Sequence, residues 1–95
     1  MDTFLAEAYL SGTAYGLGSS MARARAAARE MRREGVSIRF LRSFFLPEDE
    51  LWFGLFEATS HQEVAELSRR AELVVSRIQR AVMGEGSRPT RQVCR

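Results

Sequence analysis

Two apolar segments, residues 36–46 and 51–58, constrain the fold of this chain more than any other feature. Bulky side chains alternate along both segments, as they do in β-strands. The stretch between them, Pro47-Glu48-Asp49-Glu50, is polar, and its proline presets the backbone for a turn. Two strands joined by so short a turn predict an antiparallel hairpin.

A strand and a helix are predicted before the hairpin. Residues 3–10 place four apolar side chains on one face of an extended segment. Residues 21–34 are almost wholly strong helix formers, and Ser19 or Ser20 can cap the start of this helix. Gly35 then supplies the left-handed residue with which helices commonly end.

A second helix and a fourth strand are predicted after the hairpin. Ser60 with Glu63 fits a capping box, and residues 76–83 read as a strand. We therefore expect one ferredoxin-like domain over residues 1–84 and a flexible basic tail over residues 85–95. The order βαββαβ predicts an α+β fold with a four-stranded antiparallel sheet and two helices on one face. Right-handed crossovers place the first and third strands in the middle.

Charge and composition exclude several classes of partner. The tail holds three of the fourteen arginines and one of the twelve acidic residues, so residues 1–84 are neutral and predict no nucleic-acid partner. No apolar run approaches the ~20 residues that cross a bilayer, so no membrane partner is expected. No basic region precedes the first apolar segment, which predicts a cytoplasmic protein without a signal peptide. One histidine, His61, and one cysteine, Cys94, are too few for a His/Cys-rich metal site.

The second face of the predicted sheet is unusually apolar. An antiparallel sheet covered by helices on one side normally alternates to polar residues on the other. Here Leu41 and Phe45 are expected on the opposite face of their strand from Phe40 and Phe44. Residues 51–58 carry large apolar groups on both faces. Because a monomer would expose an extensive apolar patch, we expect a homodimer whose open sheet faces pack together.

Several strings in the chain resemble a known protein family: FLAEAY at 4–9, EGVSIRFLRSFFLPEDE at 34–50, LFEA at 55–58 and SRRAEL at 68–73. The resemblance covers residues 3–83. It is to small actinobacterial ferredoxin-like proteins, mostly of unknown function, which include a dimeric nickel-binding member. It implies the dimeric α+β-barrel architecture that small monooxygenases, lactone isomerases and polyketide cyclases share. Members often carry Cys and His where this chain has Trp52 and Gly54, which speaks against a metal site on that strand.

The predicted small-molecule site lies between the sheet and the first helix. Small residues on the central strands, Gly54 among them, meet an alanine-rich helix face, so the helix either settles closer to the sheet or leaves a cavity. The cavity would have aromatic walls and one cationic anchor, a common form of ligand site. Its candidate substrate-binding residues are Phe40, Arg42, Phe44, Trp52, Gly54 and Phe56. An ion pair at the rim is the alternative explanation of Arg42.

Three residues on the opposite face of the central strands are candidates for catalysis: Glu7, Glu57 and Tyr9. Two carboxylates on adjacent strands can act as general acid and base when one pKa is raised. The alternative is that each carboxylate pairs with an arginine such as Arg39 or Arg77. Sequence alone does not decide whether they face the pocket or the dimer interface.

These observations lead to two main hypotheses about function, beside a third in which the chain is a small interaction module whose open sheet face docks on another protein. The first is a small cofactor-independent enzyme of the isomerase, cyclase or proton-transfer type that acts on an apolar or aromatic molecule, in natural-product biosynthesis for example. The alternative is a non-catalytic dimer that holds a ligand or a metal such as nickel. No cofactor is expected, and His61 is expected to be a solvated residue in the first turn of its helix.

Overall fold

A computed structural model describes residues 1–10, 14–84 and 86 of the chain. The elements follow the order β1 (Asp2–Tyr9), α1 (Ala14–Arg33), β2 (Arg39–Leu46), β3 (Leu51–Ala58), α2 (His61–Arg70) and β4 (Val75–Ala81). The predicted βαββαβ order is therefore confirmed. The predicted tail, 85–95, lies outside the described residues except for Gly86.

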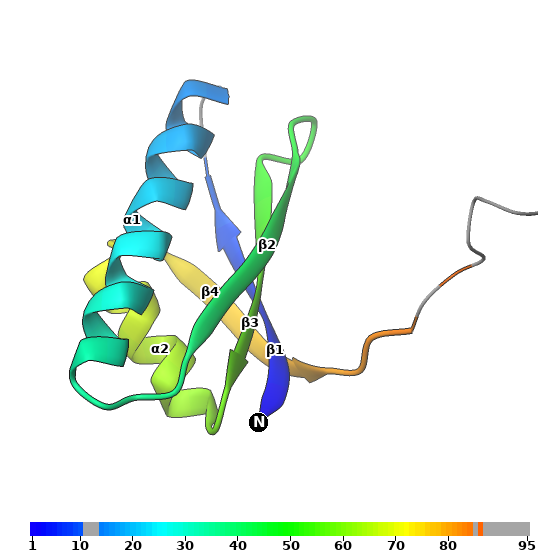
Figure 1. The fold of residues 1–95 in the computed structure, drawn as a ribbon. Coiled ribbons are helices and arrows are strands. Elements are labelled where there is room, and N and C mark those ends of the chain that lie inside the picture. The colour runs from blue at the N-terminus through cyan, green and yellow to red at the C-terminus, as the bar shows by residue number, and fades with distance from the viewer. Residues whose placement is uncertain (11–13, 85, 87–95) are drawn as a thin grey trace, which may run out of the picture.

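The four strands form one antiparallel sheet in the order β2-β3-β1-β4. As predicted, the first and third strands are central. Both helices lie on one side of this sheet (Figure 1). The structure is thus a ferredoxin-like α+β fold with one face covered and one face open.

The end of α1 explains why β2 starts later than predicted. The Val36 amide donates to the Met31 carbonyl (3.0 Å) and the Gly35 amide to the Arg32 carbonyl (3.0 Å), which together form a Schellman motif. Gly35 has a φ of 94°, as its predicted role requires. Since Val36 closes the helix, the strand begins only at Arg39.

The start of α2 follows the predicted capping box with one change. The Ser60 hydroxyl accepts a hydrogen bond from the Glu63 amide (3.3 Å). The Glu63 carboxylate reaches back to the Thr59 amide (2.8 Å) and hydroxyl (2.7 Å), one residue before the cap. His61 is exposed in the first turn, as expected.

A β-bulge in β2 changes which side chains face the helices. Phe40 is paired with Phe56 on the helix-covered face, but the next paired residue, Arg42, lies opposite Leu55. Leu41 is the extra residue, and every side chain beyond it is on the other face from the one that simple alternation predicts. The expectation that Arg42 shares a face with Phe40 is therefore wrong.

An arginine on α2 ties the two helices together. The Arg70 guanidinium lies 3.0 Å from the Glu30 carboxylate, 2.9 Å from Glu34 and 2.7 Å from Glu66. Hydrogen bonds from Arg69 and Arg70 lower the pKa of Glu66 from 4.5 to about 2, and Arg70 likewise lowers the pKa of Glu34. The cluster therefore stabilises the helix pair only while these carboxylates are ionised.

We expect Arg70→Met to weaken the pH dependence of stability in acid. A carboxylate whose folded pKa is lowered stabilises fully above its ordinary pKa, and this contribution disappears as the pH falls through the folded value. The wild type should thus exceed Arg70→Met in melting temperature at pH 6, and the gap should close towards pH 2. Thermal melts followed by circular dichroism measure this. Arg69→Met, which breaks only the exposed pair with Glu66, is the control with the smaller gap. A gap of constant size from pH 6 to pH 2 would contradict the prediction.

Candidate functional site

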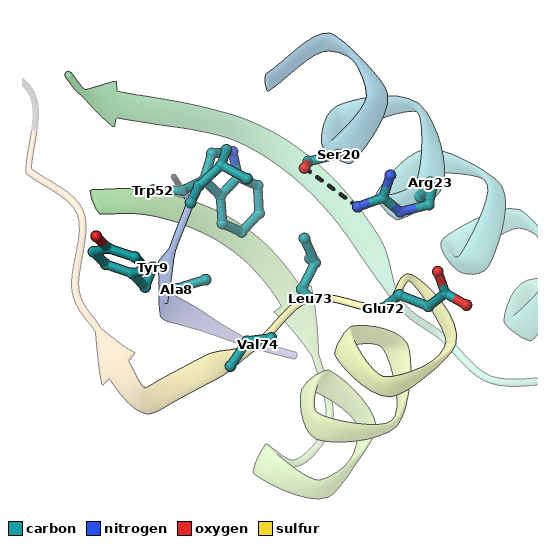
Figure 2. A pocket seen from close by; sticks show the side chains of 9 residues that line it. Ala8, Tyr9, Ser20, Arg23, Trp52, Glu72, Leu73 and Val74 are labelled. Carbon is teal, nitrogen blue, oxygen red and sulfur yellow. Dashed lines mark hydrogen bonds between the residues drawn. The ribbon is translucent and has the colours of Figure 1, made fainter. Parts of the chain in front are cut away.

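A cavity of about 320 Å³ lies where the N-terminal half of α1 meets the end of β1 and the segment between α2 and β4 (Figure 2). Its volume is at the lower end of the ~300–1,000 Å³ typical of small-molecule sites. The described residues that line it are Ala8, Tyr9, Leu10, Ser20, Arg23, Trp52, Glu72, Leu73 and Val74.

Two local features bring these side chains together. Ser20 and Arg23 are three residues apart on α1 and therefore share one face of the helix. At the end of α2, the Leu73 amide donates to the Ser68 carbonyl (2.9 Å) and Glu72 adopts a φ of 59°, a left-handed conformation that usually requires glycine. This tight reversal carries residues 72–74 beneath α1, where they close one side of the cavity.

Arg23 is the cationic group of the cavity, and its side chain is held in one orientation. Its Nε donates to the Ala71 carbonyl (2.7 Å), Nη1 to the Ser19 hydroxyl (2.6 Å) and Nη2 to the Ser20 hydroxyl (3.4 Å). All three acceptors are neutral. Within residues 1–10, 14–84 and 86, no ion pair involves Arg23.

Trp52 forms the aromatic wall and is completely buried. Its indole N–H has no hydrogen-bond acceptor among the residues that the structure describes. The ring lies over Gly54, where a Cβ would come within 3 Å of Trp52 and of Phe56. The space expected above Gly54 is therefore filled by the indole, and the cavity lies beside it.

The structure brings four of the predicted substrate-binding residues together on the helix-covered face. The Phe40 ring centroid lies 6.2 Å from that of Trp52 and 5.2 Å from that of Phe56, and Gly54 is beneath them. Of these four, only Trp52 lines the cavity. Phe56 belongs to the core and Phe40 packs against it.

Arg42 and Phe44 lie on the open face, because of the bulge in β2. With Glu57 they line a groove of about 560 Å³ that also includes Arg39, Leu41, Leu55 and Met83. The cation beside the cavity is Arg23 instead, which sequence reasoning missed. A signal was present: Ser19 and Ser20 precede Arg23 by four and three residues, next to the alanine stripe of α1.

Glu7 and Glu57 both lie on the open face, away from the cavity. Glu57 is paired with Thr3 and Glu7 with Phe53, so the two carboxylates are separated by four positions along β1, or roughly 13 Å. Arg39 forms an ion pair with Glu57 (3.1 Å), which confirms for Glu57 the arginine pairing considered from the sequence. A catalytic role for either carboxylate stays a prediction.

Tyr9 lies at the edge shared by the cavity and the open face, and is 58% exposed. Its hydroxyl donates to the Glu50 carboxylate in the hairpin turn, and this bond and the negative charge of Glu50 raise the pKa of Tyr9. The Leu10 amide also donates to the Glu50 carbonyl (2.8 Å). These contacts attach the turn to the end of β1.

The described part of the chain holds neither a metal-binding cluster nor a membrane-spanning helix. Over residues 1–10, 14–84 and 86, no group of three or more His, Cys, Asp or Glu side chains could hold a metal ion. Cys94 lies outside the described residues. Neither α1 nor α2 has the length and apolar composition of a membrane-spanning helix.

Comparison with known proteins supports the fold. The sequence matches no family model and no curated protein. Its structure is similar to that of SCO4226 from Streptomyces coelicolor A3(2). The TM-score is 0.73 and the identity 15%, over 87% of this chain and 99% of that one. At this identity the likeness establishes the ferredoxin-like architecture alone.

Proposed function

We propose that this protein binds a small apolar or aromatic molecule in the cavity beneath α1. The observation that carries the proposal is the cavity itself, which combines apolar walls with a few convergent polar groups, the usual composition of a ligand site. Leu10 and Leu73 supply accessible apolar surface beside the buried Trp52 ring, and Arg23 with the buried Ser20 supplies the polar groups.

We also propose that the working form is a homodimer that joins two open faces. This face is defined by seven apolar residues: Leu5, Leu41, Phe44, Leu46, Leu51, Phe53 and Leu55. A four-stranded sheet of this length covers roughly 500 Å² in flat projection, and more when side-chain relief is counted. Because a stable interface buries about 800 Å² per partner, a second copy must cover nearly the whole face. The face also carries both signs of charge, with Arg39 paired to Glu57 near the end of β3 and Glu7 opposite Arg77 where β1 pairs with β4.

The finer hypothesis, an acid/base enzyme of the isomerase or cyclase type, would place Glu7 and Glu57 in the dimer interface rather than at the cavity. The binding function needs neither residue, so Glu7→Gln and Glu57→Gln should leave ligand affinity unchanged. The metal-binding alternative and membership of the nickel-binding family rest on the sequence resemblance alone. Metal analysis of the purified protein tests that alternative.

Trp52 is the only tryptophan, so its fluorescence reports directly on the cavity. We expect members of a panel of small aromatic compounds to shift or quench its emission and to raise the melting temperature, since a ligand that binds only the folded state stabilises it. Leu73→Phe adds a ring to the cavity wall and should abolish this binding. Leu46→Phe makes the same change on the open face and should preserve it.

Two results would contradict the proposal. One is a panel in which no compound changes the emission or the melting temperature. The other is binding that survives Leu73→Phe unchanged, because the ligand would then occupy another site.

A further inference from the structure

We infer that the cavity selects ligands that carry a carboxylate on a flat aromatic body, and that Arg23 is the residue that recognises the carboxylate. This inference rests on the proposed function, since it names the class of ligand for the same cavity.

The first argument is the hydrogen-bonding state of Arg23. A guanidinium has five N–H donors, and the described contacts use three of them, one on each nitrogen. One N–H therefore remains on each of Nη1 and Nη2. An anionic carboxylate in the cavity can accept charge-assisted hydrogen bonds from these remaining donors.

The second argument is charge. The nearby Arg70 is neutralised by three carboxylates, whereas the described partners of Arg23 are two hydroxyls and a carbonyl. A partly buried cation surrounded by neutral groups is stabilised by an anion that enters its site. Glu72 also lines the cavity, but it is an exposed residue and forms no ion pair with Arg23 among the described residues. Glu72 therefore leaves the remaining N–H donors of Arg23 available and adds a modest repulsion against anions.

The third argument is preorganisation. The bonds to Ser19, Ser20 and Ala71 hold the Arg23 side chain in place before any ligand binds. An arginine that is already ordered loses less conformational entropy on binding than a free surface arginine. The partly exposed Leu10 and Leu73, beside the buried Trp52 ring, give an apolar surface for the rest of the ligand.

The test compares 2-naphthoate with 2-naphthamide, which have nearly the same shape but differ in charge. Isothermal titration calorimetry should show that the wild type binds the carboxylate at least about tenfold more tightly, as expected for charge-assisted hydrogen bonds. Arg23→Met should remove this preference. Glu72→Gln keeps Arg23 intact and should strengthen naphthoate binding, which preserves a test if Arg23→Met folds poorly.

The outcomes separate this inference from the proposed function. Equal affinity for the two probes overturns the carboxylate assignment, and the proposed function survives. Failure of both probes, while neutral compounds of the Trp52 panel still bind, also overturns it. If no compound of either set binds, the proposed function itself is wrong.

Discussion

Gly54→Ala is expected to destabilise the fold by about 1–3 kcal/mol, the range typical of overpacked cores. The new methyl group would lie 2.8 Å from Cζ3 of Trp52 and 2.9 Å from Cε2 of Phe56, and closer still to Cη2 of Trp52. Both rings are fully buried between the sheet and the helices, so neither is a flexible side chain that swings away into solvent. The backbone of β3 is held by paired strands on both sides and cannot retreat.

Gly18→Ala is the matched control, since it makes the same chemical change with the opposite expected sign. Gly18 is exposed on α1, and a Cβ there would meet no atom of the described chain within 4 Å. Alanine should stabilise the helix by about 0.5–1 kcal/mol, because glycine loses more backbone entropy on folding. Urea denaturation followed by Trp52 fluorescence and by circular dichroism measures both effects. A Gly54→Ala protein as stable as the wild type would show that Trp52 does not occupy the space above Gly54.

The order of elements was predictable because periodicity and helix-end chemistry are local. β3 has the bounds that its apolar alternation predicted, and Gly35 ends α1 in the left-handed conformation expected of it. The predicted start of α1 was wrong, because Ser19 and Ser20 lie inside the helix rather than at its N-cap. The helix begins at Ala14 and includes Gly16 and Gly18, although glycine is an unfavourable helix residue.

The site was less predictable because one inserted residue in β2 reverses the face of every side chain after it. Simple alternation places Arg42 beside Phe40, whereas the bulge at Leu41 turns Arg42 to the open face and brings Phe45 opposite Trp52. Nothing in the sequence around Leu41 marks the bulge, since no glycine or proline is present there. The cationic group of the cavity depends on a tertiary contact, because the Arg23 side chain is oriented by the Ala71 carbonyl at the end of α2. Local sequence patterns do not reveal a contact between residues 48 positions apart.

The apolar character of the open face, in contrast, did follow from sequence composition. Phe44 is 50% exposed and Leu46 42% exposed in the single chain, while Leu55 in the centre of the same face is only 9% exposed. The central side chains are thus covered by their neighbours, and the side chains of β2 stand out from the face. These outer residues are the ones from which a partner would exclude most water, so the proposed dimer should be most sensitive to charge at Phe44.

Phe44→Glu is expected to convert the proposed dimer into a folded monomer, with the dimer dissociation constant raised by at least about a hundredfold. Because the interface is two-fold symmetric, the substitution buries a carboxylate on each of the two copies. It also removes the apolar contact that each Phe44 ring makes. Ala65→Glu adds the same charge to the exposed surface of α2 and should leave the assembly unchanged. Light scattering after size-exclusion chromatography gives the mass, and circular dichroism verifies the fold. A wild-type chain that remains a monomer of 10.7 kDa at high micromolar concentration would refute the pairing of open faces, as would a Phe44→Glu protein that stays dimeric.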